Sequence, residues 1–369
     1  MKSFWKRGRL RAAVACVLLI IFSGVLLKKT GRDENRAPDF APATPPFSSQ
    51  SYIQSGSCAS LPTESIQVFF TTPGIEAAPP ILHAFLQLID SASVQICCAF
   101  YDLENEDVAR ALINKHHAGV QVAIVSDSNY DRRKAVKQCL RAGIPVVFDT
   151  SKAFMHNKFC VVDGRFVWTG STNITQNGFY KNNNNALLIN SQELAVNYIN
   201  EFEEMFLHRL FGAGSPKNTA FPLLSVSGIS IECYFAPEDG AAQRIIDCIQ
   251  TAKTSIDFMA FSFTSVPIAE AMAQRMRHGV KVRGLFEKRD ADSQHSRYRF
   301  LKENGAEVHL DINPNNMHHK VIVVDREHVI TGSYNFSKSA ETRNDENILI
   351  LHSRDIADCY VQELERQVS

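Results

Sequence analysis

The hydrophobic positions of this chain form short apolar runs separated by longer amphipathic stretches. The short runs are rich in β-branched side chains, as is typical of buried strands. They are residues 120–125, 144–148, 321–324 and 348–351. The stretches between them have the spacing or composition of helices. They are residues 106–118, 132–142, 266–278 and 295–304. This alternation predicts an α/β fold in which helices cover the sheets.

The second part of the chain repeats the pattern of the first. The matched segments are 65–70 with 230–235, 94–100 with 255–261, 117–122 with 277–282, and 158–163 with 320–325. The offset between them stays between 160 and 165 residues. A constant offset predicts one supersecondary unit used twice. We therefore expect two similar α/β halves, 64–214 and 226–369, which pack as a pseudo-twofold unit and are joined by a linker at 212–228.

The N-terminus has the pattern of a targeting segment. A basic start is followed by an apolar run at 12–27, so 1–36 is predicted to be a signal-anchor segment with an N-terminal hydrophobic helix. A signal that is removed remains the alternative. The excess of positive charge before the apolar run places the body outside the cytoplasm, either membrane-anchored or secreted. Residues 37–63 are rich in Pro and Ser and are expected to form a linker.

The net charge changes once the N-terminal segment is set aside. The whole chain has 39 basic and 39 acidic residues. Residues 1–36 contain nine of the basic and two of the acidic ones, which leaves 30 against 37 and a net charge of −7 for the remainder. Proteins that bind nucleic acid through its backbone usually have a basic surface. The basic stretches 132–137 and 288–299 lie at matching places in the halves; they are either solvated helix faces or the rim of an anion-binding cleft.

Two segments share the pattern H-x-K-x4-D, one in each half. Its residues are His156, Lys158 and Asp163, and then His318, Lys320 and Asp325. Each histidine is followed 14 residues later by the glycine of a G-S-x-N segment. The polar residues of these segments are Ser171, Asn173, Ser333 and Asn335. Two such pairs at equal spacing inside a repeat indicate a shared active site.

The residue types suit the cleavage of a phosphodiester. In H-x-K on a strand, His and Lys point to the same face. Joining the halves brings two His, two Lys and two Asn to one point, where Lys and Asn can hold the non-bridging oxygens. One histidine can then attack phosphorus while the other protonates the leaving oxygen. Asp163 and Asp325 are counted with the catalytic motif, although their place at strand ends favours a structural role.

These residues resemble the phospholipase D superfamily, whose hallmark is the paired H-x-K-x4-D motif. The resemblance covers about 64–369. It implies a phosphohistidine intermediate, no metal and no cofactor, and release of the product to water or to an alcohol. The adjacent His318 and His319 could suggest a metal site, but no further ligand set accompanies them.

In this family a carboxylate downstream of one motif typically orients the histidine of the other half. Glu346 lies 28 residues after His318, whereas the same distance from His156 leads to Asn184. The resemblance therefore implies that Glu346 holds His156. On that basis His156 is assigned as the nucleophile and His318 as the general acid and then base. What orients His318 stays open.

The expected activity is hydrolysis of a phospholipid, or transfer of its phosphatidyl group. An anchor near lipid and an acidic body favour this hypothesis. The alternative is a nuclease that uses the same site on single-stranded nucleic acid. A catalytically inactive interaction protein is disfavoured because both motif sets are intact. The head-group preference and the oligomeric state are left open.

Overall fold

The computed structural model describes residues 65–74, 79–150 and 152–368. The predicted anchor at 1–36 and the linker at 37–63 lie outside these residues, so the hydrophobic helix, the membrane attachment and the location of the body stay predictions. Within the described ranges, the helices are too short or too polar to cross a bilayer.

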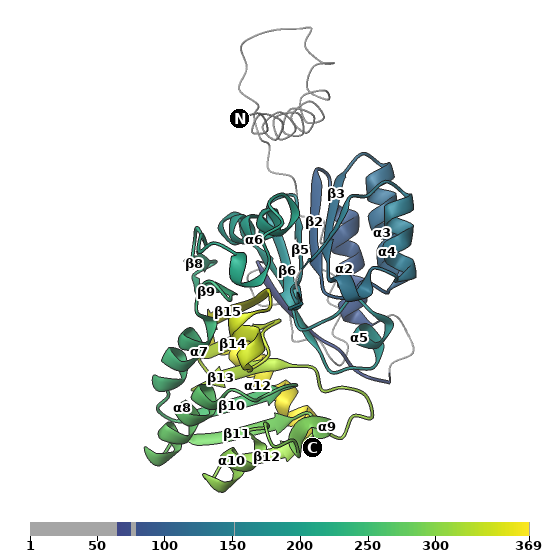
Figure 1. Ribbon diagram of the computed structural model, residues 1–369. Helices are drawn as coiled ribbons and strands as arrows, with labels where there is room; N and C mark the ends of the chain where they lie inside the picture. The colour runs from purple at the N-terminus through teal and green to yellow at the C-terminus, as the bar shows by residue number, and fades with distance from the viewer. Residues whose placement is uncertain (1–64, 75–78, 151, 369) are drawn as a thin grey trace, which may run out of the picture. The chain divides into compact units, whose positions relative to one another are not determined.

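The first half is a mixed sheet covered by helices. Its elements are β1 (Ile66–Phe70), α2 (Pro80–Ser91), β2 (Gln95–Phe100), α3 (Glu106–His117), β3 (Gln121–Ser126), α4 (Lys134–Arg141), β4 (Val146–Phe148), β5 (Lys158–Val162), β6 (Phe166–Gly170), α5 (Gln176–Tyr180), β7 (Asn185–Asn190) and α6 (Gln192–Phe206). The strand order is β1-β7-β6-β5-β2-β3-β4. Strands β2, β3 and β4 are parallel, whereas the other neighbours pair antiparallel. Helices α2, α3 and α4 pack on this sheet (Figure 1).

The second half repeats this arrangement with one more strand. Its elements are β8 (Leu223–Val226), β9 (Ile229–Ala236), α7 (Ala241–Gln250), β10 (Ser255–Ala260), α8 (Val266–Arg277), β11 (Lys281–Phe286), α9 (Lys288–Ala291), α10 (Tyr298–Glu303), β12 (Glu307–Leu310), β13 (Lys320–Val324), β14 (His328–Gly332), α11 (Lys338–Thr342), β15 (Glu346–His352) and α12 (Arg354–Val368). The strand order is β12-β11-β10-β13-β14-β15-β9-β8. The edge strand β8 lies in the segment expected to be only a linker. Its alternating burial suits a strand with one covered face.

The repeat is present, but one predicted match is out of register. Gln95 of β2 pairs with Gln121, and Ser255 of β10 pairs with Lys281 at the equivalent place. Gln95 therefore corresponds to Ser255, whereas the sequence comparison had placed residue 94 opposite 255. Both strands are buried and largely apolar, so a shift by one residue changes the hydrophobic pattern too little to be noticed.

The two halves contact each other reciprocally, as a twofold arrangement requires. The backbone N–H of His156 donates to the carbonyl of Asp345 at 3.0 Å, and that of His318 donates to Asn183 at 2.8 Å. The two hydrogen bonds are equivalent in the repeat, because His156 corresponds to His318 and Asn183 corresponds to Asp345. They belong to isolated bridges that join the loops before β5 and β13 to the segments before β15 and β7.

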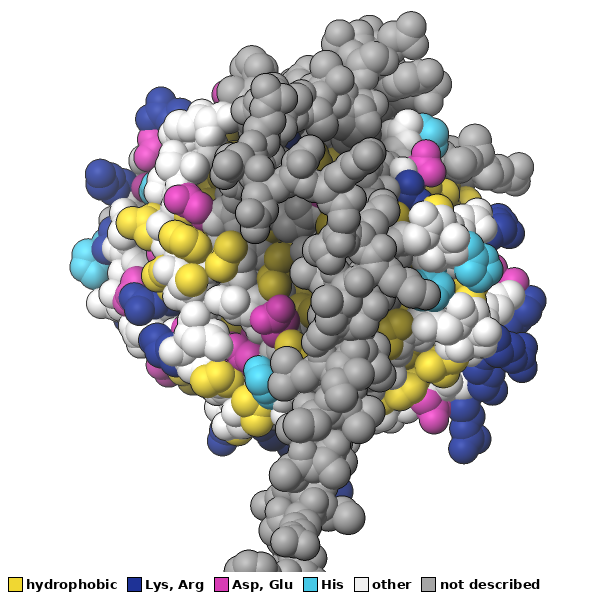
Figure 2. Space-filling view, turned by 90° about the horizontal axis from the view of Figure 1, so that it is seen from above, with side chains coloured by type: hydrophobic (Ala, Val, Ile, Leu, Met, Phe, Trp, Pro, Cys, Tyr) yellow, Lys and Arg dark blue, Asp and Glu magenta, His cyan; other side chains and the backbone are white. Residues whose placement is uncertain are grey.

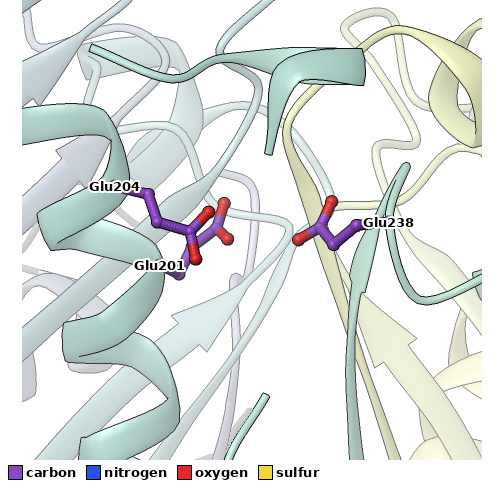
Figure 3. Close-up of side chains that lie close together, drawn as sticks. All are labelled: Glu201, Glu204 and Glu238. Atoms are coloured by element: carbon purple, nitrogen blue, oxygen red, sulfur yellow. The ribbon is translucent and has the colours of Figure 1, made fainter. Parts of the chain in front are cut away.

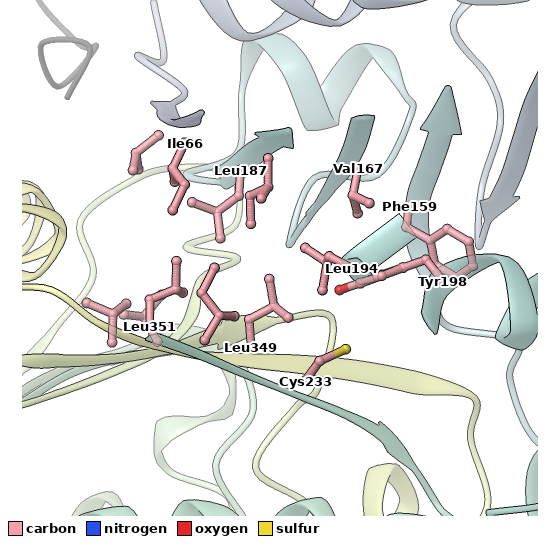
Figure 4. Packing of buried hydrophobic residues seen from close by; sticks show 14 of the residues in the cluster. Ile66, Phe159, Val167, Leu187, Leu194, Tyr198, Cys233, Leu349 and Leu351 are labelled. Carbon is pink, nitrogen blue, oxygen red and sulfur yellow. The ribbon is translucent and has the colours of Figure 1, made fainter. Parts of the chain in front are cut away.

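A shared hydrophobic core lies between the two sheets. It includes Phe159 and Leu187 from the first sheet, Tyr198 from α6, and Leu349 and Leu351 from the second sheet (Figure 4). Helix α6 also packs against β9 of the other half, and α12 packs against β1. Because each half contributes one face of this core, the halves form one folding unit, and the histidine-bearing loops are held against each other at its edge.

Candidate active site

Both predicted histidines lie just before a buried strand. His156 precedes β5 and His318 precedes β13, so each lysine two residues later begins its strand. The histidine side chains and both lysines are buried. Burial lowers the pKa of His318, and the positive charges of Lys320 and of Lys158 from the other half lower it further. The two motif sets therefore belong to one electrostatically coupled site.

Glu346 holds the histidine of the opposite half. Its carboxylate lies 2.7 Å from Nδ1 of His156, at the start of β15. Burial lowers the pKa of His156 to about 4, in spite of the opposing effect of Glu346. Burial alone would raise the pKa of Glu346, but contacts with His156 and Lys158 hold it below its usual value. The pair is therefore a carboxylate and a neutral imidazole. Nδ1–H donates to the carboxylate, and Nε2 keeps its lone pair.

His318 is oriented by neutral oxygens instead of a carboxylate. Its Nδ1 lies 2.9 Å from Oδ1 of Asn184 and 3.0 Å from the carbonyl oxygen of Ser171. The Asn184 amide is fixed because its Nδ2 donates to the Gly178 carbonyl at 2.9 Å. Both partners are acceptors, so Nδ1 of His318 carries the hydrogen. Burial lowers the pKa of His318 well below its usual value, and Lys320 adds to this. Asn184 thus takes the place of an acid and settles what orients His318.

The serines of the two G-S-x-N segments hold the orienting side chains. Ser171 Oγ donates to Asn184 Oδ1 at 2.9 Å, and Ser333 Oγ donates to Glu346 at 2.7 Å. The glycine before Ser171 allows the backbone there to lie close to the backbone of the neighbouring strand. Gly170 has a φ of 149°, and a Cβ there would lie 2.4 Å from the carbonyl oxygen of Asn185. Ser171 and Ser333 are thus positioning residues behind the histidines.

The two lysines are held in equivalent ways. Lys158 Nζ donates to the carbonyl of His156, and Lys320 Nζ donates to that of His318. Each Nζ lies 4.7 Å from the centre of an aromatic ring, Tyr101 for the first and Phe261 for the second. Burial lowers the pKa of Lys158 to about 7. An ammonium group in such a site is stabilised by an anion, which a phosphodiester supplies.

The aromatic residues Tyr101 and Phe261 were missed by the sequence analysis. Their rings also lie against the imidazoles of the two motifs, with centres 4.7 Å apart for Tyr101 and His156 and 4.6 Å apart for Phe261 and His318. They occupy the same position in each half, directly after β2 and β10. The signal that could have found them is an aromatic residue at the end of the same strand in both halves. The one-residue register error hid it.

The two asparagines of the G-S-x-N segments keep a free polar group. Oδ1 of Asn173 and Oδ1 of Asn335 are buried, and neither has a hydrogen-bond partner within the part of the chain that the structure describes. Buried amides without partners are uncommon, and the same atom is left in both halves. This symmetry is consistent with the predicted role of the amides in binding substrate.

Asp163 and Asp325, which were counted with the catalytic motif, have the structural contacts that their place at strand ends favoured. The Asp163 carboxylate accepts the backbone N–H groups of Ser93, Val94 and Gln95 at 2.8–2.9 Å. Asp325 does the same for residues 253–255. Each carboxylate caps the start of the neighbouring strand: Asp163 caps β2, which pairs with β5, and Asp325 caps β10, which pairs with β13. The motif aspartates therefore fix the strands that present His and Lys.

The lysine burial has a consequence for stability that can be measured. Lys158 has a pKa of about 7 in the folded chain and an ordinary value of 10.5. Between these values the unfolded chain binds one more proton, so the free energy of unfolding rises with pH. We expect Lys158→Met to reduce that slope by up to about 1.4 kcal/mol per pH unit between about pH 7.5 and 9.5. Urea unfolding at several pH values measures it; equal slopes in both proteins would contradict the assignment. Inorganic phosphate should flatten the wild-type slope, because a bound anion keeps the proton on Lys158.

Comparison with known proteins shows one domain match in each half. The model of the family described as "Cardiolipin synthase, PLD-like domain" matches residues 85–206 and 245–368. Each match contains one H-x-K-x4-D motif and the G-S-x-N segment after it. The family pattern therefore coincides with the structural repeat.

Similar proteins include hydrolases of phospholipids by name. The chain is 30% identical over 169 residues to a phospholipase D of Rickettsia felis, covering 46% of this chain and 84% of that protein. It is 30% identical over 134 residues to the human mitochondrial cardiolipin hydrolase, covering 36% of this chain and 53% of that protein. Phosphatidylserine synthase of Haemophilus influenzae has the same fold, with a TM-score of 0.64 and 15% identity over 83% of this chain and 86% of that one.

Proposed function

Because the chain belongs to the phospholipase D superfamily, and is thereby a phosphodiesterase of the phospholipase D type, we propose that it cleaves phospholipids through a phosphohistidine on His156. The observation that carries this proposal is the contact between His156 Nδ1 and the Glu346 carboxylate at 2.7 Å. It holds the imidazole in the tautomer whose Nε2 lone pair can attack phosphorus.

In the first step, Nε2 of His156 forms a bond to phosphorus while the bond to the leaving alcohol oxygen breaks. His318 enters this step as an imidazolium and gives its Nε2 proton to that oxygen. Its neutral partners, Asn184 and the Ser171 carbonyl, stabilise the imidazolium less than a carboxylate would, so the proton is readily given up. Lys158 and Lys320 neutralise the charge on the non-bridging oxygens.

In the second step, a water or alcohol oxygen attacks phosphorus and the P–N bond to His156 breaks. The now neutral His318 takes the proton of the attacking oxygen and returns to its first state. Glu346 stabilises positive charge on the His156 ring while the intermediate exists. These residues fill the nucleophilic, acid–base and charge-stabilising roles, so the proposed reaction requires no metal ion at phosphorus.

Two observations, the names of similar proteins and the net charge, support a phospholipid over a nucleic acid as substrate. The similar proteins named above are a phospholipase D and a cardiolipin hydrolase. The chain after residue 36 has a net charge of −7, which repels a polyanion. In the uncovered parts of the face shown in Figure 2, Lys and Arg side chains occur together with Asp and Glu side chains.

The proposal is tested by offering both substrates to the purified full-length chain in EDTA. We expect release of head group from phosphatidylglycerol or cardiolipin vesicles at 20 °C, and formation of a new phosphatidyl alcohol when a primary alcohol is added. His156→Ala, prepared in the same way, is the control that ties the products to this site. Cleavage of labelled single-stranded DNA with the vesicles left intact would replace this proposal by the nuclease alternative. Turnover that depends on an added divalent ion at that temperature would contradict the metal-free chemistry.

A further inference from the structure

Three carboxyl groups meet between the halves, apart from the catalytic histidines. Glu201 and Glu204 extend from α6, and Glu238 extends toward them from the loop after β9 (Figure 3). One carboxylate oxygen from each lies within 4.8 Å of the others. In the described ranges, none of the three forms an ion pair with a basic side chain. The group therefore brings three carboxyl groups together at an internal interface without a basic partner.

The carboxyl group of Glu204 is buried without a basic or hydrogen-bonding partner among the described residues. The residue is only 4% exposed, and its carboxylate faces the other two carboxyl groups (Figure 3). Neither of its oxygens has a hydrogen-bond partner of good geometry in the described structure, and burial raises its pKa to about 7 in spite of the opposing effect of the Asn218 amide. Among the described residues, one oxygen of Glu238 is also buried without a hydrogen-bond partner. A buried carboxyl group without such a partner either takes up a proton or coordinates a metal ion.

The second half shows what the first half lacks. Helices α6 and α12 each have 15 residues and are equivalent in the repeat, starting at 192 and 354. Glu201 therefore corresponds to Glu363, and Glu204 corresponds to Arg366. The guanidinium of Arg366 binds both oxygens of Glu363, at 2.7 and 2.8 Å. In the first half a third acid, Glu238, approaches and the arginine is replaced by a glutamate.

We propose that a divalent cation binds between Glu201, Glu204 and Glu238. It would supply the positive charge that these carboxyl groups lack, as the Arg366 guanidinium does for Glu363 in the second half. Carboxylate oxygens are ligands for the hard cations Ca²⁺ and Mg²⁺. We choose Ca²⁺ because it accepts an irregular set of oxygens in flexible geometry, whereas Mg²⁺ demands a nearly ideal octahedron. Glu238 is only partly buried, which leaves a path for the ion and for water ligands.

The site would join the two halves directly behind the nucleophile. Glu201 accepts a hydrogen bond from Nδ2 of Asn157 at 3.1 Å, and Asn157 stands between His156 and Lys158. The Asn157 oxygen in turn accepts from Asn347, the neighbour of Glu346. A cation here therefore stabilises the interface that sets the His156–Glu346 geometry, without touching the substrate phosphate. Its effect is expected on stability rather than on the chemical step.

The test is a thermal and calorimetric titration of the full-length chain after removal of metal with EDTA. We expect one Ca²⁺ per chain by isothermal titration calorimetry and a Tm higher by roughly 5 °C at about a hundred times the Kd. Glu204→Gln and Glu238→Gln should each lose this response. Glu203→Gln, on the exposed face of the same helix, should keep it. This readout does not depend on which phosphodiester the enzyme cleaves.

A transplanted arginine makes the test specific. Glu204→Arg recreates the arrangement of Glu363 and Arg366, so it should raise the Tm in EDTA above that of the wild type and abolish the Ca²⁺ response. A wild type that responds to no divalent ion would overturn the proposal and show that the carboxyl groups carry protons instead. A Ca²⁺ response that survives in Glu204→Gln and Glu238→Gln would also overturn it, since the ion would then bind elsewhere.

Discussion

Replacing His156 by alanine is expected to abolish the covalent phosphoenzyme and to lower turnover by about 10⁴-fold or more. His156 is the imidazole whose Nδ1 is held by a carboxylate, so its Nε2 is the more basic and more nucleophilic of the two. The remaining imidazole cannot replace it, because His318 faces the neutral oxygens of Asn184 and Ser171. Without a nucleophile at the first position, no bond to phosphorus forms.

The companion change, His318→Ala, should separate loading of the enzyme from its breakdown. A p-nitrophenyl phosphodiester has a leaving group that needs no proton, so this variant should still form the phosphoenzyme. The intermediate should then accumulate, since the base that activates water is missing. Acid quenching with a ³²P-labelled substrate, followed by mapping of the labelled peptide, measures both effects. His117→Ala, at an exposed histidine outside the motifs, is the control for loss of a histidine as such.

Label found on His318 and absent from His156 would reverse the assignment. The family membership would stand, because both histidines lie in equivalent motifs. Equal labelling of both positions would contradict the asymmetry that Glu346 and Asn184 impose. Both histidines are buried, so circular dichroism is needed to check that each variant keeps the wild-type fold.

The duplicated motif made the fold and most of the site predictable. A constant offset between repeated segments implies two copies of one unit, and alternating short apolar runs and helical stretches imply α/β copies. The strands and helices lie close to the predicted ranges; β3 at Gln121–Ser126 and α3 at Glu106–His117 are examples. The pairing of His156 with Glu346 came from the resemblance, since no property of the local sequence links residues 190 positions apart.

What the sequence did not reveal depends on contacts between the halves. The sequence placed Asn184 at the position equivalent to Glu346, but an amide in a run of asparagines gave no reason to predict its contact with His318. Tyr101 was overlooked because a buried apolar strand conceals its register. Likewise, Glu204 looks like one more acid on an amphipathic helix. Only the tertiary structure places it beside Glu201 and opposite Glu238, at the position that Arg366 fills in the other half.

The second large effect is expected at Glu346. Three donors converge on its two oxygens: His156 Nδ1 and Ser333 Oγ on one, and Asn344 Nδ2 on the other. A glutamine can offer oxygen to only one side, so its NH₂ must face a donor in either orientation. If the NH₂ faces His156, the imidazole changes tautomer and Nε2 loses its lone pair. If it faces Asn344, the charge that stabilises the phosphohistidine is still gone.

We therefore expect Glu346→Gln to lower the rate of phosphoenzyme formation by about 10⁴-fold, the order of loss seen when an orienting carboxylate is replaced by its amide in a serine protease. The cost in stability should be only about 1–3 kcal/mol, as for one unsatisfied buried donor. Rapid-quench measurement of the first turnover gives the rate, and urea unfolding gives the stability.

The matched change, Asn184→Asp, tests the other half. A carboxylate there should raise the pKa of His318, because it favours the imidazolium. The alkaline limb of the pH–rate profile should then move to higher pH, with less than about a tenfold change in the rate of loading, since His156 and Glu346 are untouched. A Glu346→Gln enzyme that loads at the wild-type rate would remove the physical basis for calling His156 the nucleophile. So would an Asn184→Asp enzyme that loses loading while its pH profile stays in place.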